Sequence, residues 1–184
     1  MTIMLQEGLE LLANRLLLLL RTSMALGYIP ISWRHIRVVF VSKPGRPLSQ
    51  ANSLRPISLM SFILKTLEKL LGRHIRDGVL AERPLHQNQF AYRTGMSTET
   101  AFFQVVHRLE KSLNHRDIAL GAFLNTEGAF DNISFNAIIT AAREGGLEET
   151  CCRWITSMLE SRLVLTSLMG SSLTAKVVGG CPRG

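Results

Sequence analysis

The stretch AFLNTEGAFD, residues 122–131, has the order of a strand end, small residues and an acid, which is a common layout for a metal site. The apolar run Ile118 to Leu124 leads into it. This run is continuous rather than alternating, which predicts a strand covered on both faces. Glu127 and Asp131 follow among small residues, and a rigid strand end suits a metal ligand. The residues alone leave a second interpretation open, in which both acids are solvated side chains in a strand-to-helix connection.

Downstream of this stretch, the pattern alternates between helix and strand. Ser134 is a candidate N-cap for a helix that ends at Gly145 and Gly146. A short helix and then a β-hairpin follow, predicted over residues 150–159, 163–168 and 173–178.

Upstream, the elements are bounded by glycine and proline. The patterns predict helices over residues 5–26 and 61–79, a strand over 36–41, a loop over 87–96 and a helix that Ser97 caps. Gly27 and Pro84 are expected to end the two earlier helices. The whole order predicts a mixed α/β (α+β) fold.

Positive charge is concentrated in the first half of the chain. The formal net charge is +7, and all of it falls in residues 1–84. The basic side chains around the strand 36–41 and the proline-rich turn after it are Arg34, Arg37, Lys43, Arg46 and Arg55. Such a block indicates a polyanion partner such as a nucleic acid, or a solvated basic face.

Other classes are disfavoured by composition. Three cysteines, two of them adjacent at Cys151 and Cys152, predict no disulfide framework, so we expect a reducing intracellular setting (cytoplasm or nucleus) rather than secretion. The leucine run Leu16 to Leu20 is flanked by Arg15 and Arg21. It is far short of the roughly 18–20 residues that span a bilayer, so no membrane partner is expected.

Five segments together resemble the reverse transcriptase of non-LTR (LINE-like, jockey/R1-type) retrotransposons. Each segment alone is modest, but their order along the chain is specific. In sequence they are RVVFVSKPGR (37–46) after Trp33, LRPISL (54–59) with KTLEK (65–69), QFAYR (89–93) with STETA (97–101), GAFLNTEGAFDN (121–132) and GGCPRG (179–184).

This resemblance implies an RNA-directed DNA polymerase of right-hand architecture. The chain would be a partial domain, residues 1–184, with fingers plus partial palm. The implied parts are an N-terminal helix at 1–30, fingers-like residues 31–115 and a partial palm at 116–184. Family members act on an RNA or DNA template-primer and deoxynucleotides, and they use Mg²⁺.

The resemblance also assigns roles to particular residues. Lys43, Arg46 and Arg55 stand where the family contacts template and triphosphate. Phe130 stands at the aromatic position that screens the sugar, where a bulky ring excludes the 2′-OH. Asn125 stands at the metal-ligand position of the family's first catalytic motif.

Two residues depart from the family pattern, and the first of them, Asn125, leaves the metal site incomplete. The family has Asp where this chain has Asn125, and an amide brings no charge to offset Mg²⁺. The family has Gln where this chain has Arg183. The chain is also expected to be a truncated fragment, because it stops before the Tyr-Ala-Asp-Asp-type motif. The sequence thus leaves three interpretations: a piece of a polymerase, a non-catalytic nucleic-acid-binding module, and an unselected relic of a mobile element. Whether the chain is an enzyme stays open.

Overall fold

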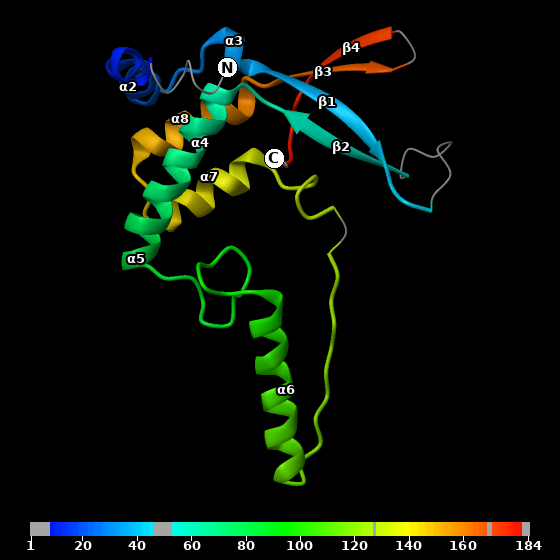
Figure 1. Cartoon of the computed structure of the whole chain (residues 1–184). Coiled ribbons are helices and arrows are strands. Elements are labelled where there is room, and N and C mark those ends of the chain that lie inside the picture. Colours follow the sequence, from blue (N-terminus) through cyan, green and yellow to red (C-terminus); the bar gives the residue numbers. More distant parts are fainter. Residues whose placement is uncertain (1–7, 46–52, 127, 169–170, 182–184) are drawn as a thin grey trace. The chain divides into compact units, whose positions relative to one another are not determined.

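The computed structural model describes residues 8–45, 53–126, 128–168 and 171–181 (Figure 1). The chain forms two compact units. The first unit comprises residues 1–79 and 128–184, and the second comprises residues 80–127. This partition differs from the predicted boundaries at residues 30 and 115, which follow the family resemblance and stay a prediction.

The first unit contains a four-stranded mixed sheet in the order β2-β1-β3-β4. Its strands are β1 (His35–Ser42), β2 (Leu54–Leu59), β3 (Leu163–Leu168) and β4 (Ser171–Lys176). β1 pairs antiparallel with β2 and parallel with β3, and β3 and β4 form an antiparallel pair. The predicted strand over 36–41 and the predicted hairpin are confirmed, with β4 beginning two residues earlier than expected. β2 escaped prediction because it contains Pro56, which a sheet tolerates at its edge.

The helices of the first unit begin and end largely where the sequence signals stand. They are α2 (Leu9–Leu26), α3 (Ile31–Arg34), α4 (Phe62–His74), the π-helical η2 (Ile75–Val79), α7 (Phe135–Glu144) and α8 (Glu149–Glu160). Gly27 ends α2 in the left-handed conformation, at φ 59°, which glycine adopts without strain. The Ser134 hydroxyl accepts a hydrogen bond from the Ala137 N–H at 3.2 Å and caps α7. No helix among the described residues is long and apolar enough to cross a membrane.

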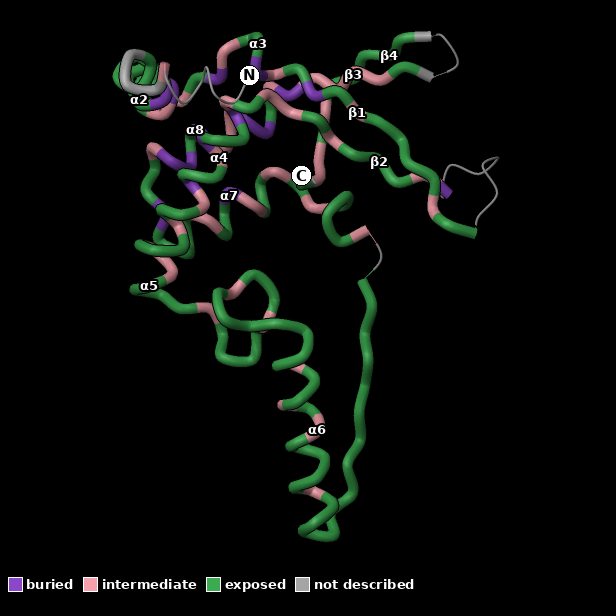
Figure 2. Tube along the Cα trace, in the orientation of Figure 1, coloured by how far each residue is buried: buried purple, intermediate pink, exposed green. Residues whose placement is uncertain are grey.

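The hydrophobic core of the first unit lies among these helices. Figure 2 shows buried segments gathered in α4, α7 and α8. Trp154 and Cys152 of α8 are fully buried, as is Leu64 of α4. The Trp154 indole N–H donates to the Ser23 hydroxyl at 3.1 Å, and that hydroxyl donates to the Tyr28 carbonyl oxygen at 2.7 Å. This hydrogen-bonded chain ties α8 to the turn that follows α2.

The second unit has no such core. Its helices are α5 (Leu80–Glu82) and α6 (Thr98–Asn114), and Ser97 and Thr100 form a reciprocal capping box at the start of α6. The predicted loop over 87–96 contains neither helix nor strand. None of the described residues from 80 to 126 is buried (Figure 2).

The predicted buried strand at Ile118 to Leu124 is wrong. These residues form no helix or strand, and Ile118 and Leu120 are each 97% exposed, Phe123 92% and Leu124 96%. A strand is stable only when neighbours pair with its backbone and cover its side chains. The apolar run has the composition of a buried strand, but no strand among the described residues pairs with it.

Candidate functional site

A basic face on the β1–β2 ladder is the first feature of the site. In this ladder Arg37 lies opposite Leu59, and Val41 lies opposite Arg55. Side chains alternate between the two faces of a strand, so Arg37 and Arg55 share one face. The pairing continues through the Lys43 N–H, which donates to the Ser53 carbonyl oxygen at 2.8 Å. Lys43 comes six residues after Arg37, so by the same alternation it lies on the face of Arg37 and Arg55.

These three cations span the length of the ladder. Arg37 and Arg55 are exposed and Lys43 is half-buried. At 3.3 Å per residue, Arg37 and Lys43 are about 20 Å apart along the strand. The structure thus places three of the basic residues singled out in the sequence on one face of the ladder. Arg46 lies outside the described residues.

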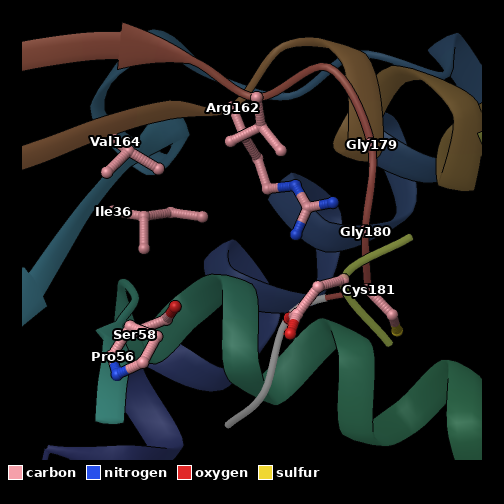
Figure 3. Close-up of a pocket in the computed structure, with 10 residues that line it drawn as sticks. Ile36, Pro56, Ser58, Arg162, Val164, Gly179, Gly180 and Cys181 are labelled. Atoms are coloured by element: carbon pink, nitrogen blue, oxygen red, sulfur yellow. The ribbon is translucent and has the colours of Figure 1, made fainter. Parts of the chain in front are cut away.

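The opposite face of the same ladder borders a pocket of about 200 Å³ (Figure 3). Ile36 of β1 contributes to its wall, as do Pro56 and Ser58 of β2. The remaining lining residues are Asp131, Arg162, Val164, Val177, Gly179, Gly180 and Cys181. Strands, the turn before α7 and the segment after β4 therefore meet around one hollow.

The turn before α7 is hydrogen-bonded to the segment after β4. The Cys181 N–H donates to the Phe130 carbonyl oxygen at 2.7 Å, and the Gly180 N–H donates to the Ile133 carbonyl oxygen at 2.9 Å. Gly180 has φ +84°, and a Cβ there would lie 3.2 Å from two carbonyl oxygens, those of Phe130 and Asp131. Glycine is required for this close approach. Phe130, the predicted sugar-screening residue, is thus fixed through its backbone against the Gly-Gly-Cys segment.

Arg162 is the most deeply buried charge in the pocket wall. Its side chain points into the pocket (Figure 3), and the residue is only 3% exposed. Nε donates to the Leu159 carbonyl oxygen at 3.4 Å, and the guanidinium carbon lies 5.8 Å from the centre of the Phe135 ring. Nη2 is buried without a hydrogen-bond partner. Burial lowers the pKa of Arg162, against the opposing influence of Cys181 and Glu68.

Glu68 of α4 is an acid whose negative charge acts on Arg162 and opposes the lowering of its pKa. Its Oε1 is also buried without a hydrogen-bond partner. Burial raises the pKa of the Glu68 carboxyl, and the positive charges of Arg162 and Lys65 counteract only part of that shift. Sequence reasoning missed both residues. For Arg162, the sequence offered one signal of burial, which is its position between the end of an amphipathic helix and the start of a hairpin.

Asn125 belongs to the second unit, where it is exposed in an irregular segment. Glu127 lies outside the described residues, and so does Arg183. Asp131 lines the pocket of the first unit, yet it belongs to no group of three His, Cys, Asp or Glu ligands within coordinating reach among the described residues. An amide oxygen such as that of Asn125 brings no charge to balance Mg²⁺. The described residues of each unit therefore provide no carboxylate cluster that fits the divalent metal the family uses.

The class of protein follows from comparison with known sequences. The family profile described as "Reverse transcriptase (RNA-dependent DNA polymerase)" matches residues 41–184. The chain belongs to this reverse transcriptase family. The match includes the β1–β2 ladder from Val41 onward, the turn at Phe130 and the Gly-Gly-Cys segment.

Curated proteins similar to this chain include three from mobile elements of Drosophila melanogaster. The RNA-directed DNA polymerase from mobile element jockey is 24% identical over 170 residues, which is 92% of this chain and 18% of that protein. The putative 115 kDa protein in type-1 retrotransposable element R1DM is 31% identical over 160 residues, 86% of this chain and 15% of that protein. The probable RNA-directed DNA polymerase from transposon BS is 26% identical over 117 residues, 64% of this chain and 13% of that protein. The chain spans less than a fifth of the length of each.

Proposed function

We propose that the chain is the fingers and the first part of the palm of a retrotransposon RNA-directed DNA polymerase, and that it binds template-primer through the basic face of β1 and β2. The observation that carries the proposal is the alignment of Arg37, Lys43 and Arg55 on one face of the ladder. Phosphates contacted by a row of cations release counterions, which drives binding without sequence preference. Family membership identifies the polyanion as a nucleic acid, because reverse transcriptases act on nucleic acid.

Family membership supports a nucleotide-handling role for the palm part. Phe130 is the proposed sugar gate, and its backbone is fixed by Cys181. Lys43, Arg46 and Arg55 are the proposed contacts to template and triphosphate. The free thiols of all three cysteines support a reducing location inside the cell.

The same proposal assigns no complete catalytic centre to these 184 residues. Two-metal phosphoryl transfer needs ions about 3.5–4 Å apart, which carboxylates hold and neutralise. Asn125 stands where the family has its first catalytic Asp, and the sequence contains no Asp-Asp pair. A non-catalytic nucleic-acid-binding module is therefore the alternative that Asn125 favours.

Replacing the basic face tests the binding role. Arg37, Lys43, Arg46 and Arg55 changed together to Ala should weaken binding of both RNA and DNA at low salt, with no dependence on sequence. Fluorescence anisotropy with labelled oligonucleotides measures this, with circular dichroism as the control for folding. Unchanged affinity of the folded quadruple variant would show that the face does not contact phosphate.

Primer extension tests the catalytic part of the proposal. The purified chain should extend no primed RNA template with Mg²⁺ or Mn²⁺, and Asn125→Asp alone should not restore extension. Asn125→Asp joined to a C-terminal palm segment from a relative should restore it. Extension by the unaltered chain, with contaminating polymerase excluded, would overturn the assignment.

A further inference from the structure

Three potential metal ligands converge at one end of the helical core, away from the ladder and its pocket. They are His74 at the last position of α4, Glu148 at the N-cap of α8, and Cys151 in the first turn of α8. The ligand atoms of these side chains all lie within 4.8 Å of one another. Among the described residues, these are the three potential metal ligands whose ligand atoms come within this distance of one another.

The three side chains differ in how firmly they are held. Cys151 is buried and belongs to the core cluster, so its position is fixed by packing. His74 and Glu148 are exposed. The Glu148 side chain makes no capping hydrogen bond to the first turn of α8, although it occupies the N-cap position. One anchored ligand therefore stands beside two whose side chains have room to rotate.

The geometry is close to that of a four-coordinate zinc site. Zinc bonds of about 2.0–2.3 Å in a tetrahedron place ligand atoms roughly 3.3–3.8 Å apart. The upper bound of 4.8 Å leaves about 1 Å to close, which rotations of the exposed His74 and Glu148 side chains supply. Imidazole, thiolate and carboxylate together are a donor set that zinc accepts, with water in the fourth position.

Local charge also favours a cation at this point. The ligand atoms of Glu148 and Cys151 lie within 4.8 Å of each other. A divalent cation between the carboxylate and the thiolate would offset both negative charges. The other acid of this turn, Glu149, is already engaged with Arg143 at 2.7 Å.

We propose that His74, Glu148 and Cys151 form a binding site for Zn²⁺ that fastens the C-terminal end of α4 to the N-terminal end of α8. Binding replaces the thiol proton of Cys151 by the metal and releases that proton to solvent. The site joins segments more than 70 residues apart in the sequence, so it is expected to stabilise the first unit. It is independent of the polymerase assignment.

Titration of the full chain with Co²⁺ and Zn²⁺ tests the site. Co²⁺ bound by a thiolate gives a charge-transfer absorption in the near ultraviolet, which Zn²⁺ should bleach by displacement. Zn²⁺ at a hundredfold excess over Kd should raise Tm by about 5–10 °C. Both signals should disappear in His74→Ala, which removes an exposed side chain and leaves the core intact, and in Cys151→Ser.

Two control variants each remove one thiol or one imidazole that lies outside the proposed zinc site. Cys181→Ser removes an exposed thiol and His115→Ala removes an exposed imidazole in the second unit, and both should bind like the parent. If Cys151→Ser does not fold, His74→Ala decides the question. Absence of the Co²⁺ band in the folded parent would overturn the proposal. Survival of the band in His74→Ala, or its loss in either control, would also overturn it.

Discussion

Two segments rich in apolar residues differ in burial: one lies in the core and the other is exposed. The α8 segment Cys151 to Leu159 buries Cys152 and Trp154 completely and Leu159 almost completely. The segment Ile118 to Leu124 exposes nearly all of its apolar surface. The sequence predicted a short helix for the first segment and a buried strand for the second. The difference is that α8 satisfies its own backbone and needs only one apolar stripe to be covered, whereas a strand depends on neighbours for both.

The comparison shows what a local pattern can establish. A helix forms its hydrogen bonds within the segment, so the 3.6-residue spacing of α8 determines both its structure and its buried stripe. An apolar run of strand length indicates only that the segment can be buried. Its actual burial is a property of the surrounding chain.

Truncating one side chain in each segment should give the largest contrast. Trp154→Ala removes a fully buried indole and its hydrogen bond to Ser23, so it should cost about 3–5 kcal/mol in the free energy of unfolding. Phe123→Ala removes a ring that is 92% exposed and should change that free energy by about 0.5 kcal/mol or less. Urea denaturation followed by circular dichroism measures both. Equal costs would mean that residues 118–124 are packed in solution.

Two Gly→Ala substitutions compare a glycine with positive φ, Gly180, with a glycine inside a helix, Gly72. Gly180→Ala introduces a Cβ 3.2 Å from two carbonyl oxygens at φ +84°, and we expect a loss of about 1–3 kcal/mol. Gly72→Ala lies inside α4, where no atom outside the helix's own nearby backbone and the two adjacent residues is within 4 Å of the added Cβ, and should stabilise the chain by about 0.5–1 kcal/mol. Thermal melts of the two variants should shift in opposite directions. A neutral Gly180→Ala would show that the segment does not close on Phe130.

Two carboxyls should give pH dependences of opposite sign. Burial raises the pKa of Glu68, so the folded state holds its proton more tightly than the unfolded state. Stability then falls as the pH rises from about the ordinary carboxyl value of 4.5 through the raised value. Glu68→Gln should remove this fall and raise stability at neutral pH.

The hydrogen bond from Arg143 lowers the pKa of Glu149 in the folded state. Its contribution is present above the ordinary carboxyl value and is lost as the pH falls through the lowered one. Both groups of this pair are exposed, so the effect of Glu149→Gln should be the smallest of those expected here. Unfolding curves of both variants between pH 3 and pH 8 test the signs, and a Glu68→Gln curve parallel to the parent's would contradict the assignment.

Sequence predicted the elements that carry their own signals. Gly27, Ser97 and Ser134 mark helix ends through backbone chemistry, and the structure confirms all three. The sequence could not show that Gly180 closes on the Phe130 carbonyl, nor that Arg162 and Glu68 influence each other's pKa. Those relations join residues from separate elements, and tertiary packing alone sets them. Arg37, Lys43 and Arg55 were predicted as a basic group, but their common face required the strand register.

The salt dependence of RNA binding tests the central claim most directly. For a short single-stranded RNA, loss of three phosphate contacts should reduce the slope of log affinity against log salt by about 2. We predict this reduction when Arg37, Lys43 and Arg55 are replaced by Ala. The matched control replaces three exposed cations elsewhere, Arg108, Lys111 and Lys176, and should retain the parent's slope. Equal slopes for the parent and the Arg37, Lys43 and Arg55 variant, or a loss of slope in the control instead, would contradict the account.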